Sequence, residues 1–69
     1  MTIQEYSLDL KQTFGKGFVN QSELCRYIGC GKAAARKLLE NVPYLQSGRE
    51  KRYPIREIAK ALHYEEVGG

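Results

Sequence analysis

Residues 21–40 read QSELCRYIGCGKAAARKLLE, and this stretch decides the fold. Apolar residues recur at helical spacing on both sides of Gly29-Cys30-Gly31, which indicates two short amphipathic helices joined by a tight turn. The second helix carries nearly all its exposed charge as lysine and arginine. A basic helix that a neighbouring helix holds rigidly fits the major groove of DNA, which is about 12 Å wide.

The residues that border the two helices are typical of helix starts and helix ends. Asn20 followed by Glu23 is a capping-box pattern, so the first helix should begin directly after Asn20. Gly29 tolerates the positive φ that ends a helix, and Gly31 is an acceptable N-cap for the helix that follows. Segment 20–41 therefore predicts a helix-turn-helix.

Helical spacing divides the side chains of this pair into inward and outward sets. In the first helix, the apolar side is expected to comprise Leu24, Cys25, Tyr27 and Ile28. In the second helix, the apolar arc comprises Ala34, Ala35, Leu38 and Leu39. The opposite arc comprises Lys32, Ala33, Arg36, Lys37 and Glu40. Pro43 ends this helix, because a residue that precedes proline is pushed out of the α region.

A helix is also predicted at the N-terminus, over residues 1–15. Thr2 and Glu5 form a second capping-box pattern, and the glycine at position 15 punctuates the end of the helix. Its apolar stripe comprises Ile3, Tyr6, Leu10 and Phe14. Phe18-Val19 then indicates a short buried extended stretch.

The second half of the chain predicts a hairpin followed by a helix. Residues 44–54 contain the turn Ser47-Gly48-Arg49-Glu50, so we expect two short strands whose tip and second strand are basic. Pro54 suits the first turn of a last helix over residues 55–63, and residues 65–69 are expected to form a frayed tail. The expected architecture is mostly α with a small β-hairpin.

Length and charge narrow the class of function. A chain of 69 residues forms one domain, 1–69, and buries only about 60% of the surface that its unfolded form exposes, which argues against a deep catalytic cleft. Residues 32–52 carry six cations and two anions, a net charge of +4, whereas the rest of the chain carries five cations and six anions, a net charge of −1. This confinement of positive charge favours a polyanionic partner over an ordinary solvated surface.

Cysteine and histidine usage gives no sign of a metal site or an enzyme. Cys25 and Cys30 have no second pair, and His63 lies far along the chain, so we expect two reduced core thiols, no metal, no cofactor and no catalysis. Reduced thiols fit the cytoplasm. The chain has no apolar run of about 18 residues and no signal-peptide pattern, so no membrane association is expected.

From Phe18 to Leu62 the chain resembles the small winged helix-turn-helix proteins of the excisionase and MerR-like type. The residues that carry the resemblance are Leu24-Cys25, Ile28-Gly29-Cys30, Ala35, Leu38 and the wing-like run from Ser47 to Ile55. The chain departs from the family pattern at Cys30 and Gly31, where a branched apolar residue and Ser or Thr are more usual. The resemblance implies a winged helix-turn-helix fold and sequence-specific binding of double-stranded DNA.

The exposed arc of the second helix supplies the candidate DNA-binding residues Lys32, Ala33, Arg36 and Lys37, of which Arg36 is the first choice for reading a base. The guanidinium of Arg36 matches guanine O6 and N7, a pairing worth roughly 1–3 kcal/mol of discrimination. Ala33 suits contact with a thymine methyl group, or is simply a good helix former. On the hairpin, the candidates for phosphate or minor-groove contact are Arg49, Lys51 and Arg52. Gln21 and Ser22 are weaker candidates for a phosphate. Tyr27, Tyr44 and Tyr53 are expected to be half-buried supports.

Two classes of function remain open from sequence. The resemblance favours an excisionase, which bends DNA and directs a tyrosine-type integrase in recombination, with a small phage or mobile-element transcriptional regulator as the alternative. A module of this size buries only about 600–1,000 Å² of protein on DNA, so dimerisation or neighbouring copies on repeated sites are expected. The other class is a protein-interaction module that uses the N-terminal helix stripe or Leu8 as its contact.

Overall fold

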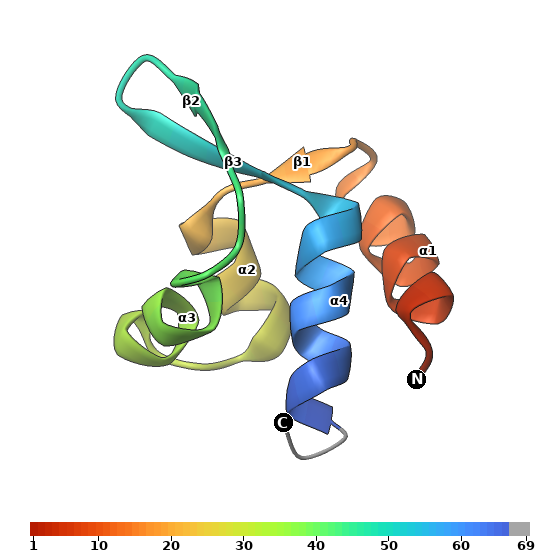
Figure 1. The fold of residues 1–69 in the computed structure, drawn as a ribbon. Helices are drawn as coiled ribbons and strands as arrows, with labels where there is room; N and C mark the ends of the chain where they lie inside the picture. The colour runs from red at the N-terminus through yellow and green to blue at the C-terminus, as the bar shows by residue number, and fades with distance from the viewer. Residues whose placement is uncertain (67–69) are drawn as a thin grey trace.

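The computed structural model describes residues 1–66, which form four helices and a small antiparallel sheet (Figure 1). In chain order the elements are α1 (Ile3–Phe14), β1 (Phe18–Val19), α2 (Gln21–Ile28), α3 (Lys32–Leu39), β2 (Leu45–Ser47), β3 (Glu50–Pro54) and α4 (Ile55–Glu66). This confirms the expectation of a mostly helical chain with a small β-hairpin.

The sheet has three strands, whereas the sequence predicted only a two-stranded hairpin. β3 is the central strand: its first half pairs with β2 in the register Gln46 to Lys51, and its second half pairs with β1 in the register Val19 to Tyr53. The third strand forms because β3 extends past β2 and would otherwise leave backbone groups unpaired. Of the two β1 residues, Val19 is buried and Phe18 is exposed, so the predicted buried stretch is confirmed for Val19 and wrong for Phe18.

Local sequence signals determine the ends of the first three helices. Thr2 and Asn20 each complete a capping box, with Glu5 and Glu23 respectively. Gly29 ends α2 with φ of 76°, in the left-handed region that favours glycine. α3 begins after an N-cap glycine, which offers no side-chain hydrogen bond. The predicted starts of α2 and α3 and the predicted end of α2 are therefore confirmed, whereas α3 ends at Leu39, before the stop predicted at Pro43.

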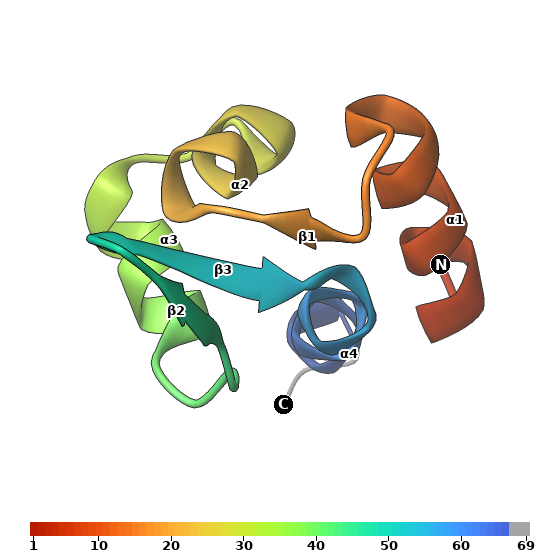
Figure 2. The ribbon, with the colours of Figure 1, turned by 90° about the horizontal axis from the view of Figure 1, so that it is seen from above.

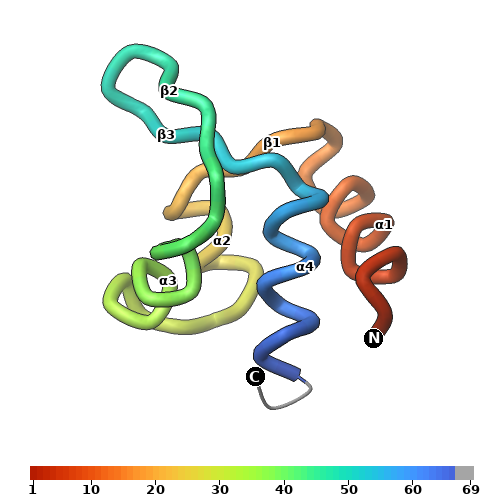
Figure 3. The backbone as a smooth tube through the Cα atoms, in the orientation of Figure 1, coloured from red at the N-terminus to blue at the C-terminus, as the bar shows by residue number. Residues whose placement is uncertain are grey.

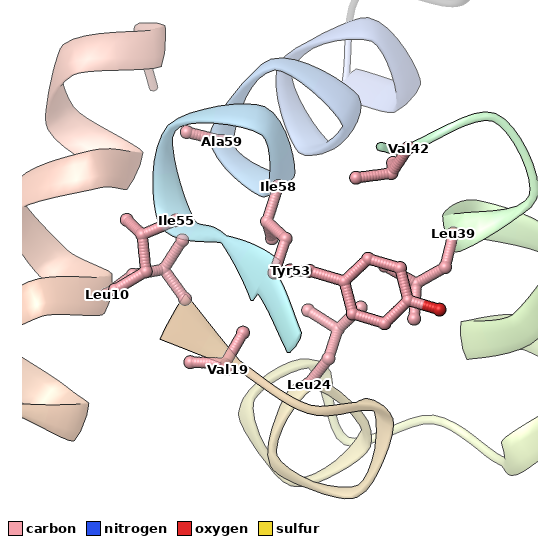
Figure 4. Close-up of a cluster of buried hydrophobic side chains, with 9 residues drawn as sticks. All are labelled: Leu10, Val19, Leu24, Leu39, Val42, Tyr53, Ile55, Ile58 and Ala59. Carbon is pink, nitrogen blue, oxygen red and sulfur yellow. The ribbon is translucent and has the colours of Figure 1, made fainter. Parts of the chain in front are cut away.

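One apolar cluster joins all the helices to the sheet (Figure 4). It comprises Leu10, Val19, Leu24, Leu39, Val42, Tyr53, Ile55, Ile58 and Ala59. Figure 2 shows α1 and α4 at one end of the sheet and α3 with the hairpin at the other. The stripe of α1 lies against this core, with Leu10 fully buried and Ile3, Tyr6 and Phe14 partly buried. The apolar stripe of α1 therefore packs against the core of the same chain.

Several predicted positions differ in the structure. Ile28 and Ala34 are exposed. Ala34 lies at the margin of its apolar arc, whereas Ile28 is the last residue of α2 and lies next to the surface turn. Cys25 and Cys30 are half-buried rather than core residues: Cys25 lies within α2, and Cys30 lies in the turn between α2 and α3. The predicted positions of Leu24, Tyr27, Ala35, Leu38 and Leu39 on the inward side are confirmed.

The last helix begins and ends differently from the prediction. Pro54 is the final residue of β3 rather than part of the helix, because it lies opposite Phe18 in the sheet. α4 continues past His63 to Glu66, whose carboxylate accepts a hydrogen bond from the Tyr6 hydroxyl at 2.7 Å. This contact with α1 explains why two residues of the predicted tail are helical. Residues 67–69 of that tail lie outside the described residues.

Candidate nucleic-acid interface

An open groove runs between the start of α2, the exposed face of α3 and the hairpin. It consists of two adjoining hollows of about 750 and 520 Å³, and we refer to it as the basic groove. Both hollows are lined by Gln21, Arg36, Lys51 and Tyr53. The groove therefore brings together two segments that lie 15 residues apart in the sequence, Arg36 on α3 and Lys51 on β3.

The exposed face of α3 forms one wall of the groove. Lys32, Ala33, Arg36 and Lys37 are all exposed, as the spacing predicted. Arg36 lies at the centre, where it borders both hollows, and Ala33 and Lys37 border the second one. Lys32 is at the first turn of the helix and outside the groove lining. Ala35 and Leu39 hold the opposite face of α3 in the core, so the basic face has a fixed orientation.

The hairpin forms the facing wall of the groove. Because side chains alternate along β3, its cations lie on opposite sides of the strand. Lys51 lies two residues before the buried Tyr53 and shares its side of β3, which borders the groove. Arg49 is in the turn and also borders the groove. Arg52 instead lies in a separate hollow with Lys16, beside β1, and its Nε is 3.8 Å from a Glu50 carboxylate oxygen. The structure thus separates Arg52 from the other predicted hairpin residues.

Two tyrosines support Lys51. The Lys51 Nζ is 4.8 Å from the centre of the Tyr44 ring, and the Tyr44 and Tyr53 rings are 5.8 Å apart. Tyr53 is buried, Tyr44 is half exposed and Tyr27 is half-buried, so the expectation of half-buried supports fits Tyr27 alone. The sequence reasoning missed the contact between Tyr44 and Lys51, because it depends on the register of β2 against β3.

The start of α2 closes one end of the groove. Gln21 and Ser22, weak candidates from sequence, both line it. Asn20 does more than cap α2: its Oδ1 accepts from the Glu23 backbone N–H at 2.8 Å, and its Nδ2 donates to Glu50 Oε1 at 2.6 Å. No local pattern indicates this second bond, because its partners are 30 residues apart.

An ion pair between Lys16 and Glu23 also holds the start of α2. Lys16 Nζ is 2.7 Å from Glu23 Oε2. Partial burial acts to raise the pKa of Glu23, but the hydrogen bonds from Lys16 and from the Asn20 backbone outweigh it and lower that pKa below the usual value. Glu23 is therefore ionised at neutral pH and keeps the start of α2 in place.

No group of three or more His, Cys, Asp or Glu side chains within residues 1–66 is arranged to hold a metal ion. The sulfur of Cys25 faces the backbone oxygen of Gly31 at 3.9 Å. No helix in that range is long and apolar enough to cross a membrane.

Comparisons with protein-family models, with curated proteins and with solved structures give no match for this chain.

Proposed function

We propose that this protein binds double-stranded DNA as a small winged helix-turn-helix module. In this proposal α3 enters the major groove and the hairpin acts as a wing on the flanking backbone. The observation that carries the proposal is the basic groove, where Arg36 from one element and Arg49 and Lys51 from another line the same open surface. An acidic backbone that approaches this surface meets cations from both walls at once.

The two walls of the groove carry different residues, which suit different contacts with DNA. Arg36 is on a rigid helix with its guanidinium exposed, which suits bidentate pairing with a guanine edge. Lys32 and Lys37 flank it, and Ala33 offers a small apolar contact. Arg49 and Lys51 are on a projecting hairpin, which suits phosphate contacts that fix register without reading sequence.

Within this class we favour an excisionase, an architectural protein that bends DNA and directs a tyrosine-type integrase in DNA excision. The support is the sequence resemblance, from Leu24-Cys25 through the run Ser47 to Ile55. The alternative is a small transcriptional regulator of a phage or mobile element, which would use the same surface. Either protein would act in the cytoplasm and would gain affinity from self-association on repeated DNA sites. A footprint over attachment sites beside an integrase gene supports the first, whereas a footprint over a promoter supports the second.

A protein-interaction module is the competing class. The packing of the α1 stripe against the core weakens this hypothesis. Among the residues that the sequence suggested as a protein contact, only Leu8 is largely exposed. The basic groove, by contrast, is lined by exposed cationic side chains, among them Arg36, Arg49 and Lys51.

Salt dependence of binding to random-sequence duplex DNA tests the proposal directly. If four phosphates are neutralised, log K should fall against log salt with a slope of about −3.6. Lys51→Gln should reduce that slope, whereas Lys60→Gln, which removes the same charge from α4, should leave it close to that of the native protein. No binding at low salt, or a flat salt response, would exclude DNA as the partner.

A further inference from the structure

The outer part of the hairpin projects from the body of the protein, as Figure 3 shows. Every residue from 45 to 49 is exposed, so this part has no side chain in the core. Apolar anchorage begins only at Tyr53, near the other end of β3. Two-stranded hairpins without such packing are only marginally ordered in water. The Tyr44 contact holds the Lys51 side chain. The outer backbone of the hairpin, which carries Arg49, needs another constraint to keep a defined position relative to α3.

That constraint is the bond between Asn20 and Glu50. Within residues 1–66 it is the only side-chain hydrogen bond that joins the hairpin to a helix. Glu50 is half-buried and lies between Arg49 and Lys51 in the chain, so a bond at this residue restrains the backbone next to both cations. Asn20 is itself held, because its other amide atom caps α2. The bond thus connects a fixed helix end to the loosely packed half of the hairpin.

The presence of a carboxylate here supports a positional role. Glu50 lines the same groove as Arg36, Arg49 and Lys51, and its negative charge opposes the approach of a phosphate. A hydrogen bond to a charged group is about twice as strong as one between neutral groups. The carboxylate therefore weakens polyanion binding through charge but strengthens the bond that orients the hairpin.

We propose that Asn20 and Glu50 form a latch that sets the position of the hairpin relative to α3, so that Arg49 and Lys51 reach the same duplex as Arg36. Asn20 is then a positioning residue for DNA binding, in addition to its role as a cap. This inference rests on the proposed function for its DNA component, whereas the ordering of the hairpin stands independently of it.

Three variants separate the latch from the cap. Asn20→Ser keeps a good N-cap but removes the amide that donates to Glu50. Asn20→Asp also keeps the cap and places a second carboxylate against Glu50. The double variant Asn20→Asp/Glu50→Gln reverses the polarity of the bond, since the amide introduced on the hairpin would donate to the carboxylate introduced at the cap. It also leaves the net charge of the protein unchanged.

The experiment measures 15N relaxation of the hairpin amides in the free protein, together with affinity for duplex DNA and the melting temperature. In Asn20→Ser and Asn20→Asp, order parameters of residues 46–49 should fall from about 0.85 toward 0.6. DNA affinity should fall about tenfold, which corresponds to about 1.4 kcal/mol. The double variant should recover both properties.

Each departure from this pattern has a distinct meaning. Unchanged hairpin order in Asn20→Ser overturns the latch. Reduced order with unchanged DNA affinity overturns the positioning role in binding. Failure of the double variant to recover both hairpin order and DNA affinity would also overturn the latch, because that variant keeps the cap and restores a bond between positions 20 and 50. If the native protein itself does not bind DNA, the proposed function fails, and the relaxation data alone decide whether the latch exists.

Discussion

The ammonium group of Lys51 lies 4.8 Å from the centre of the Tyr44 ring, on the side of the hairpin that faces α3. A contact of this kind at an exposed site contributes about 0.5–1 kcal/mol, enough to favour one orientation of a flexible side chain. The neighbouring Arg52 lies on the other side of β3 and near Glu50. Lys51 and Arg52 are therefore adjacent on β3, but only Lys51 lines the basic groove.

We expect Lys51→Ala and Arg52→Ala to differ in their effect on DNA binding, although each removes one positive charge. Lys51→Ala should weaken binding to all sequences and reduce the magnitude of the salt slope by about 0.9, the value for one phosphate contact. Arg52→Ala should change the slope by less. Fluorescence anisotropy at several salt concentrations measures both. A larger effect from Arg52→Ala would place the DNA on the opposite side of the hairpin.

Replacement of Arg36 should change specificity rather than general affinity. Arg36→Ala should lower discrimination at one base pair by about 1–3 kcal/mol while retaining most binding to random sequence. Selection of preferred sites from a random duplex library, followed by single-base substitutions in the selected site, measures this. If Arg36→Ala and Lys51→Ala weaken all sequences equally, Arg36 does not read a base.

The two glycines of the turn should respond in opposite ways to substitution. Gly29 has φ of 76°, so Gly29→Ala should lower the free energy of unfolding by about 1–2 kcal/mol. Gly31 has φ of −76° and open space around its Cα, so Gly31→Ser should add the missing N-cap bond to α3 and raise stability by a few tenths of a kcal/mol. Urea denaturation measures both. Stabilisation by Gly29→Ala would contradict the left-handed conformation at that residue.

Acid should remove the contribution of Glu23 to stability. Its pKa is lower in the folded protein than the ordinary value of 4.5, so its stabilising effect is complete above that pH and is lost as pH falls through the folded-state pKa. Glu23→Gln retains a capping-box side chain but lacks the ion pair with Lys16. The difference in unfolding free energy between the native protein and this variant should be constant near neutral pH and shrink below pH 4.5. A difference that persists at the lowest pH would mean that the Glu23 charge is not its source.

The features that the sequence predicts correctly arise from local interactions. The capping boxes at Thr2 and Asn20 and the left-handed Gly29 involve residues within a few positions of one another, and all three were predicted. The exposed face of α3 follows from helical spacing in the same way. The third strand was missed because the pairing of Val19 with Tyr53 joins distant parts of the chain.

The sequence by itself determined the helices, the hairpin and the identity of the exposed cations, because caps, turns and periodicity act over a few residues. Only the tertiary structure decided which cations share a surface. Packing of Leu39 and Tyr53 into one core brings the face of α3 opposite the hairpin, and the pleat of β3 turns Lys51 toward Arg36 while it turns Arg52 away. The bond from Asn20 to Glu50 has the same origin, since only the folded chain brings residues 30 positions apart within 2.6 Å.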